Sequence, residues 1–154
     1  MQVKDIMVSE VKTCRPDTDL AAAVQLMWTN DCGVLPVVDD QGQVVGMITD
    51  RDICIAVGNR NRPPSELTVF DVKTNPRELY TCAPEDDIHQ ALQTMQTHGV
   101  RRLPAISNGK LRGVLCLKEI ALGARKRNAL TYDDLVETLK AVCEYRAERQ
   151  AVAA

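Results

Sequence analysis

The alternation of hydrophobic and polar positions predicts short strands separated by amphipathic helices. Two apolar runs, 34–38 and 43–48, have the length of strands and are joined by the polar turn Asp39-Asp40-Gln41-Gly42. A helix is predicted before them from one apolar face, and a second helix follows at 50–57. A proline-terminated run at 11–14 precedes both, so the predicted order is strand, helix, strand, strand, helix. The residues of the first helical face are Leu20, Ala23, Val24 and Met27.

This pattern occurs twice in the chain. The run Thr13-Cys14-Arg15-Pro16 aligns with Thr81-Cys82-Ala83-Pro84 at an offset of 68, and the offset falls to 67 after the turn. In the second copy we predict strands at 79–82, 103–106 and 111–115, and a short helix at 117–121. Its longer helix presents Ile88, Ala91, Leu92 and Met95 on one face. Two copies of this length indicate a duplicated unit with pseudo-two-fold symmetry.

The predicted organisation is therefore a mixed α/β (α+β) fold of two repeats and a tail. We place the first repeat at 1–58, a polar linker at 59–66 and the second repeat at 67–124. The remaining residues, 125–154, are predicted to form a C-terminal helix that opens at Thr131. Leu135, Leu139 and Val142 would form its apolar stripe, which would dock on its own domain or on a second subunit.

Composition narrows the possible partners. The 154 residues are 45% hydrophobic but only 3% aromatic, and the formal net charge is -2. A near-neutral chain with few aromatic residues has neither the charge nor the stacking surfaces typical of nucleic-acid binding. The sequence contains no apolar run of membrane-spanning length and no signal-peptide core at its start, so we expect a cytoplasmic protein without membrane contacts.

The sequence shows no clear pattern of catalytic or metal-binding residues. The six cysteines form no C-x-x-C motif and lie in or beside apolar runs, which is typical of buried thiols in a reducing compartment. A thiol switch remains an alternative. The two histidines, His89 and His98, have no evident partner and no metal-ligand spacing. We therefore predict no metal, no required cofactor and no enzymatic activity.

The stretch from Val44 to Ile53 carries the candidate chemistry. An apolar strand ends at Thr49, and Asp50, Arg51 and Asp52 open a helix. One interpretation is that Thr49 and Asp52 only cap this helix. The other is that the helix start holds a phosphate and the carboxylate accepts hydrogen bonds from sugar hydroxyls.

The doubled unit, with Leu35-Pro36-Val37 before its turn and Gly46-Met47-Ile48-Thr49-Asp50-Arg51-Asp52 after it, resembles the CBS domain family. The resemblance spans both repeats and implies a pair packed as a Bateman module. Such modules commonly bind adenine nucleotides in clefts between the repeats, and commonly dimerise. By resemblance, Thr49 lies near phosphate, Asp52 binds the ribose, and Arg51 adds a charge-assisted bond. Backbone that borders the adenine would come from Lys12, Thr13, Cys14, Gly33, Val34, Leu35 and Pro36.

The second repeat departs from this pattern. Cys116 stands for Thr49, Lys118 for Arg51 and Glu119 for Asp52. A thiol is a poor phosphate donor and glutamate is one methylene longer, so we predict an empty or altered second site. That degenerate site comprises Thr81, Leu103, Pro104, Cys116, Lys118 and Glu119. Arg101 or Arg102 would either reach a phosphate or remain exposed at the strand end.

We therefore expect a non-catalytic regulatory module that binds an adenine nucleotide and signals to a partner protein as a homodimer. AMP, ADP or ATP is the first choice of ligand, and S-adenosylmethionine or NADH the second. The alternative is a protein-interaction or thiol-redox module that uses the same fold without nucleotide.

Overall fold

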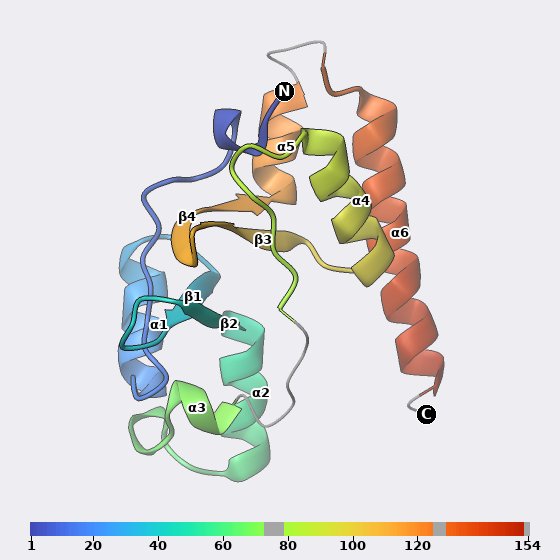
Figure 1. The fold of residues 1–154 in the computed structure, drawn as a ribbon. Coiled ribbons are helices and arrows are strands. Elements are labelled where there is room, and N and C mark those ends of the chain that lie inside the picture. Colours follow the sequence, from blue (N-terminus) through green and yellow to red (C-terminus); the bar gives the residue numbers. More distant parts are fainter. Residues whose placement is uncertain (73–78, 125–128, 153–154) are drawn as a thin grey trace. The chain divides into compact units, whose positions relative to one another are not determined.

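The computed structural model describes residues 1–72, 79–124 and 129–152, and these form two compact units. One unit combines Met1–Glu10 with Tyr80–Ala154, and the other is Val11–Leu79. Each unit contains one two-stranded antiparallel sheet with helices beside it (Figure 1). The predicted mixed α/β fold is therefore confirmed.

The unit Val11–Leu79 follows the predicted order closely. Its helical and strand elements are α1 (Leu20–Thr29), β1 (Val34–Val38), β2 (Val44–Thr49), α2 (Asp50–Arg60), a 3-10 turn (Pro64–Glu66) and α3 (Val69–Val72). The helix α2 runs three residues further than the predicted 57 because its chain reverses only at Asn61, which adopts the left-handed conformation at φ 48°.

The unit formed by Met1–Glu10 and Tyr80–Ala154 has the equivalent elements and one more helix. It contains a 3-10 turn (Val3–Asp5), α4 (Ile88–His98), β3 (Arg102–Ser107), β4 (Lys110–Cys116), α5 (Leu117–Ala124) and α6 (Tyr132–Val152). Asn108 and Gly109, at φ 52° and 72°, form the turn between β3 and β4. Two consecutive positive φ values match the twist of a hairpin, which is why an Asn-Gly pair is placed there.

The first predicted strand of each repeat is reduced to a single bridge, which corrects the predictions for 11–14 and 79–82. Cys14 pairs in parallel with Val37, and Cys82 with Ala105. The Cys14 amide donates to Pro36 O at 3.0 Å, and the Val38 amide donates to Cys14 O at 2.9 Å. The next bond toward the N-terminus would need an amide hydrogen on Pro36, which proline lacks. The proline therefore ends the pairing and leaves the Lys12 carbonyl outside the ladder.

The first residues of each predicted repeat, here called the lead-in segments (3–8 and 69–72), pack in the compact unit that contains the core of the other repeat. The Val3 amide donates to Asp86 O at 3.0 Å, and Val8 forms an antiparallel bridge with Val114. In the other unit, the Val69 amide donates to Thr18 O at 2.9 Å. The compact units therefore divide the chain at different places from the sequence repeat.

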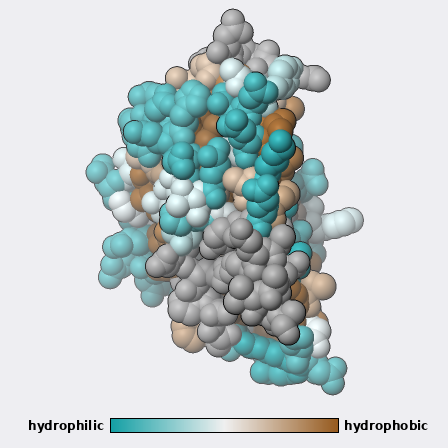
Figure 2. Space-filling model, turned by 90° about the vertical axis from the view of Figure 1, so that its right-hand side faces the viewer, coloured by the Kyte–Doolittle hydropathy of each residue, from teal (hydrophilic) through white to brown (hydrophobic). Residues whose placement is uncertain are grey.

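Each unit has its own core of aliphatic and sulfur-containing side chains. In the unit formed by Met1–Glu10 and Tyr80–Ala154, the described buried residues include Val3, Ile88, Ala91, Leu92, Met95, Leu103, Leu115 and Ile120. In the unit Val11–Leu79 they include Leu20, Ala23, Met27, Leu35, Ile48, Ile53 and Leu67. The coloured atoms of the face in Figure 2 are mainly hydrophilic, with smaller hydrophobic areas between them. None of the helices within the described ranges is long and apolar enough to cross a membrane.

The helix α6 packs against α4 and α5 of its own unit. Its N-cap is Thr131, whose amide and hydroxyl both donate to Asp134 Oδ2, at 2.8 and 2.6 Å. These hydrogen bonds lower the pKa of Asp134. The buried stripe of α6 differs from the predicted one in a single position, because Thr138 is buried whereas Leu139 is half exposed.

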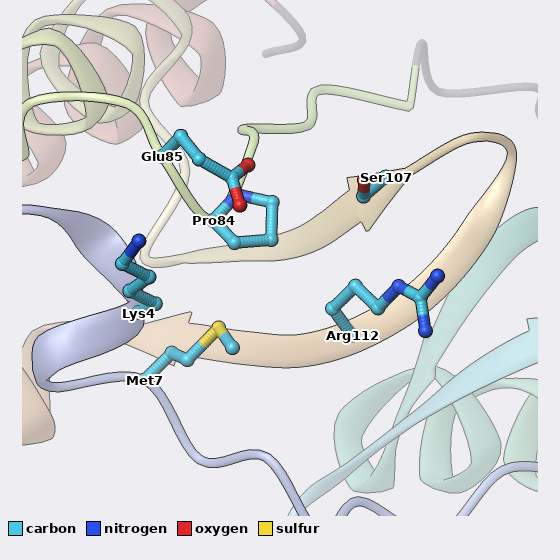
Figure 3. A pocket seen from close by; sticks show the side chains of 6 residues that line it. All are labelled: Lys4, Met7, Pro84, Glu85, Ser107 and Arg112. Atoms are coloured by element: carbon cyan, nitrogen blue, oxygen red, sulfur yellow. The ribbon is translucent and has the colours of Figure 1, made fainter.

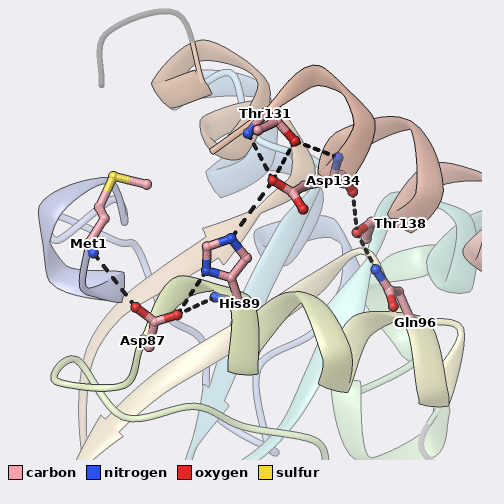
Figure 4. Close-up of polar contacts among 7 residues, drawn as sticks. All are labelled: Met1, Asp87, His89, Gln96, Thr131, Asp134 and Thr138. Carbon is pink, nitrogen blue, oxygen red and sulfur yellow. Dashed lines mark hydrogen bonds and ion pairs between the residues drawn. The ribbon is translucent and has the colours of Figure 1, made fainter. Parts of the chain in front are cut away.

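His89 has partners that the sequence did not reveal. Its Nδ1 lies 2.9 Å from Asp87 Oδ1, and its Nε2 lies 3.7 Å from Asp134 Oδ2, so it connects the start of α4 to the start of α6 (Figure 4). The hydrogen bond from the His89 amide is the main reason why the pKa of Asp87 is lowered. His98 stacks on Tyr80, with ring centroids 3.7 Å apart. Both histidines therefore have structural contacts.

Candidate functional site

Thr49 and Asp52 form a reciprocal cap at the start of α2. The Asp52 amide donates to Thr49 Oγ1 at 3.2 Å, and the Thr49 amide donates to Asp52 Oδ2 at 3.0 Å. The Thr49 hydroxyl also donates to Asp52 Oδ2, at 2.6 Å. Both side chains are partly buried, whereas Arg51, between them, is exposed. Arg51 lines a shallow hollow on α2 together with Asp50, Cys54 and Ile55.

The end of β1 lies beside this helix start. Val34 is the register partner of Thr49, and the Asp50 amide donates to Gly33 O at 3.4 Å. A Cβ on Gly33 would lie 2.9 Å from Asp50 Oδ2, so the glycine makes room for the Asp50 side chain. The structure thus brings Gly33 and Val34 together with Thr49, as predicted for one site.

The segment 12–14 approaches the same end of β1 from the other side. Because the bridge of Cys14 to Val37 is parallel, the preceding residues run alongside Pro36 and Leu35 toward Gly33. Cys14, Leu35 and Pro36 are buried, Thr13 is partly buried and Lys12 is exposed. All ten predicted residues of the first site therefore lie in the unit Val11–Leu79.

The Thr-x-x-Asp cap is not unique to this site. Thr68 and Asp71 make the same contacts at α3, with the Thr68 hydroxyl 2.8 Å from Asp71 Oδ2. Thr131 and Asp134 repeat them at α6. Sequence reasoning missed these two copies, although the spacing was visible. The cap geometry alone therefore does not distinguish a ligand site, and what distinguishes Thr49 and Asp52 is their position beside the end of β1.

The second repeat keeps the backbone frame and changes the side chains. Arg102 is the register partner of Cys116, and the Leu117 amide donates to Arg101 O at 3.1 Å, in the place of the Asp50–Gly33 bond. The Cys116 thiol lies with Glu119 and Arg102. Burial, together with the Glu119 carboxylate, raises the pKa of Cys116 to about 11, and the Arg102 guanidinium opposes both effects.

Glu119 carries an unsatisfied oxygen. Among the described residues, its Oε2 is buried and has no hydrogen-bond partner. A buried carboxylate oxygen without a donor is costly. The other residues predicted for this site are distributed as expected for a strand end, with Leu103 and Pro104 buried and Thr81, Arg101 and Lys118 exposed.

A separate hollow lies at the opposite, turn end of β3 and β4 (Figure 3). Its lining combines cationic, anionic and apolar side chains, namely Lys4, Met7, Pro84, Glu85, Ser107 and Arg112. No sequence pattern groups these residues, because Lys4 and Met7 belong to the first predicted repeat and Pro84 to the second. They meet because the Lys4 amide donates to Pro84 O, at 2.9 Å. Within the described ranges, no group of three or more histidine, cysteine or acidic side chains is placed to hold a metal ion.

The thiols are predicted to differ sharply in reactivity. Burial raises the pKa of Cys14 to about 11 and that of Cys82 to about 12, as it does for Cys116, so these three carry little thiolate at neutral pH. Cys54 and Cys143 are exposed. Titration of the native protein with a disulfide reagent should therefore show fast reaction of Cys54 and Cys143, and slow reaction of the three buried thiols.

The control for this titration is the double variant Cys54→Ser, Cys143→Ser. It should lose the fast phase and keep the slow one, and denaturant should expose the full set of thiols in both proteins. Fast modification of Cys14, Cys82 or Cys116 in the native protein would contradict the burial described here. A redox function would have to use a thiol other than these three.

Comparison with known proteins identifies the family. A family model described as the CBS domain matches residues 3–59 and 69–123. The CBS domain-containing protein YhcV of Bacillus subtilis is 34% identical over 120 residues, which cover 78% of this chain and 83% of that protein. Hypoxic response protein 1 of Mycobacterium tuberculosis is 31% identical over 140 residues, which cover 91% of this chain and 92% of that protein.

Solved structures agree with this match. The crystal structure of Hypoxic Response Protein I, which contains two coordinated zinc ions, superposes with a TM-score of 0.70 at 32% identity and covers 79% of this chain and 98% of that one. The CBS domain protein TA0289 of Thermoplasma acidophilum gives 0.75 at 25% identity, with 92% of this chain and 75% of that chain covered. The protein therefore belongs to the CBS domain family and carries two CBS domains in tandem.

Proposed function

We propose that the protein is a non-catalytic regulatory module that binds an adenine nucleotide or a related adenosyl ligand at the site around Thr49 and Asp52. It would act as a homodimer and signal ligand binding to a partner protein. AMP, ADP and ATP are the first candidates for the ligand, and S-adenosylmethionine and NADH follow. The observation that carries the proposal is the convergence of the α2 start, the Gly33–Val34 backbone and the segment 12–14 at one end of β1.

The chemistry of this strand end suits an adenosyl ligand. The Lys12 carbonyl lies outside the strand ladder because Pro36 has no amide hydrogen to offer, so it is an acceptor suited to the amino edge of an adenine. The N-terminus of α2 provides the partial positive charge that favours a phosphate, and Arg51 adds a full charge beside it. We propose that Asp52 accepts hydrogen bonds from the ribose hydroxyls.

Structures with the same fold support the ligand class. CBSX2 has been solved in complex with AMP, with a TM-score of 0.68 at 23% identity over 81% of this chain. The CBS domain pair of MJ0100 has been solved with 5′-methylthioadenosine and S-adenosylmethionine, with a TM-score of 0.68 at 21% identity over 82% of this chain. At these identities the likeness extends to the fold, and we propose by analogy that this chain takes a ligand of the same class.

The second repeat also argues that Thr49 and Asp52 serve more than the helix. The helix α5 forms with Cys116 and Glu119 at the positions of Thr49 and Asp52. A threonine–aspartate pair is therefore not required to start the helix at this point of the repeat. We propose that the second site is empty or altered, since Glu119 and Arg102 stand there in place of Asp52 and Val34.

Isothermal titration calorimetry of the wild type and Asp52→Ala tests the proposal. The wild type should bind at least one of AMP, ADP, ATP, S-adenosylmethionine and NADH. Loss of a charged acceptor for the ribose hydroxyls should weaken binding by about tenfold to a hundredfold, which corresponds to about 1.5–3 kcal/mol.

Asp71→Ala is the matched control. It removes the same kind of cap from the same compact unit, so it reproduces the structural loss without touching the proposed site. Its affinity should equal that of the wild type. Equal weakening in both variants would assign Asp52 to helix capping alone, and no binding of any of the five ligands by the wild type would refute the proposed ligand class.

A further inference from the structure

The hollow at the turn end of β3 and β4 is surrounded by charges that the rest of the described chain does not neutralise. It lies wholly within the unit formed by Met1–Glu10 and Tyr80–Ala154, and its volume of about 400 Å³ is within the range of small-ligand sites. Lys4, Glu85 and Arg112 are exposed around it. Within the part of the chain that the structure describes, none of these three side chains has an ion-pair or hydrogen-bond partner.

Apolar and hydrogen-bonding groups complete the lining of the hollow (Figure 3). Met7 packs against β4, since a Cβ on Gly113 would lie 2.9 Å from its Sδ, and Pro84 is a second apolar side chain. Ser107, the last residue of β3, provides a hydroxyl that can donate or accept. The hollow therefore combines two cations, one carboxylate, one hydroxyl and an apolar surface.

The other unit has the same backbone at this place and apolar side chains instead of the two cations. The Phe70 amide donates to Pro16 O at 2.9 Å, and the Lys4 amide donates to the equivalent proline oxygen at the same distance. Phe70 therefore occupies the position of Lys4. By the alignment of the repeats, Val45 occupies the position of Arg112. The unit Val11–Leu79 thus folds without positive charge at these two positions.

The acidic position of the hollow also differs between the two units. Asp17 is the counterpart of Glu85 in the alignment, and Arg15 pairs with it, with Nε 3.2 Å from Asp17 Oδ1. The second repeat has Ala83 in the place of Arg15, so Glu85 lacks the partner that its counterpart has. Unpaired charges of both signs are therefore particular to this hollow, at positions where the repeat does not need them to fold.

We propose that this hollow binds a free α-amino acid with an apolar side chain. Lys4 and Arg112 bind the α-carboxylate, and Glu85 binds the α-ammonium group through charge-assisted hydrogen bonds. Met7 and Pro84 contact the apolar side chain of the ligand. A zwitterion satisfies both signs of charge at once, whereas Glu85 repels a phosphate and the two cations repel a simple amine. The proposal goes beyond nucleotide binding and does not depend on it.

Nuclear magnetic resonance of isotope-labelled methionine methyl groups tests the site, because the chain has only five methionines and Met7 lies in the lining. The protein is titrated with L-leucine, L-methionine, L-valine and L-phenylalanine in the absence of nucleotide. The Met7 methyl resonance should shift and saturate with at least one of them, with a dissociation constant of about 1 mM or below. The resonances of Met27 and Met47, in the unit Val11–Leu79, should stay in place.

Two substitutions assign the two ends of the ligand, with the amino acid that binds and its deaminated analogue (isocaproate for L-leucine) as probes. Arg112→Gln should weaken both probes about threefold to tenfold, because both carry the carboxylate. Glu85→Gln should weaken the amino acid by a similar factor and leave the analogue at least as tightly bound, since only the amino acid has an ammonium group. Lys118→Gln, which removes an exposed cation of the same unit outside the hollow, should bind as the wild type does.

Three results would overturn the proposal. They are a Met7 methyl resonance that does not respond to any of the four amino acids at tens of millimolar, equal binding of the amino acid and its deaminated analogue, and weakening by Lys118→Gln as large as that by Arg112→Gln. Because no nucleotide is present and the residues tested lie outside the site around Thr49 and Asp52, none of these results bears on nucleotide binding. A protein that binds a nucleotide and no amino acid would refute this proposal alone.

Discussion

Gly113→Ala is expected to destabilise the unit formed by Met1–Glu10 and Tyr80–Ala154 by about 3 kcal/mol. A Cβ at this position of β4 would lie 2.5 Å from the backbone oxygen of Val8 and 2.9 Å from Met7 Sδ. The Val8 oxygen cannot simply move away, because it accepts a hydrogen bond from the Val114 amide at 2.9 Å. The new methyl group must therefore separate the lead-in segment from β4. Urea denaturation followed by far-ultraviolet circular dichroism measures the loss.

Gly58→Ala provides the control for this prediction. Gly58 lies in α2, and a Cβ there would meet nothing within 4 Å. Alanine restricts the unfolded chain and favours the helix, so this variant should gain up to about 1 kcal/mol. If Gly113→Ala were as stable as the wild type, the lead-in segment would not lie against β4 in solution.

The periodic elements could be predicted from the sequence because their signals are local. The apolar face of α1, the Asn-Gly turn between β3 and β4 and the polar break before α2 each depend on residues within one or two turns of chain. Because the unit is duplicated, each element predicted in one repeat is also predicted at the equivalent place in the other. Val34 lies beside Thr49 for a local reason as well, since a hairpin fixes its own register, while their role in binding a ligand stays a prediction.

What the sequence could not show is which copy a segment packs against. The lead-in segments at Val3 and Val69 each open a repeat, and the sequence does not say that the Val3 amide donates to Asp86 O while the Val69 amide donates to Thr18 O. The hollow that contains Lys4 and Arg112 depends on this exchange, so no local pattern could reveal it.

Strand propensity also gives a wrong prediction where a single backbone group decides whether a strand can pair. The segments 11–14 and 79–82 have the composition of strands, but each lies beside a proline in the neighbouring strand, so only one bridge forms. On α6, Thr138 is absent from the predicted apolar stripe because it is polar. Its hydroxyl donates to Asp134 O and accepts from Gln96, which makes its burial possible and moves the buried stripe away from Leu139.

Leu92→Ala is expected to cost about 2–4 kcal/mol, because it removes a buried side chain from the contact of α4 with the core and α6. Leu92 lies one helical turn from Gln96, which binds Thr138, so both face the docked helix. The loss should appear in urea denaturation followed by circular dichroism.

Leu122→Ala makes the same chemical change on the neighbouring helix α5, where the side chain is 58% exposed, and should cost less than about 1 kcal/mol. The difference between the two variants therefore measures what covering an apolar helix face contributes in this fold. Equal costs would mean that α6 does not cover α4 in solution.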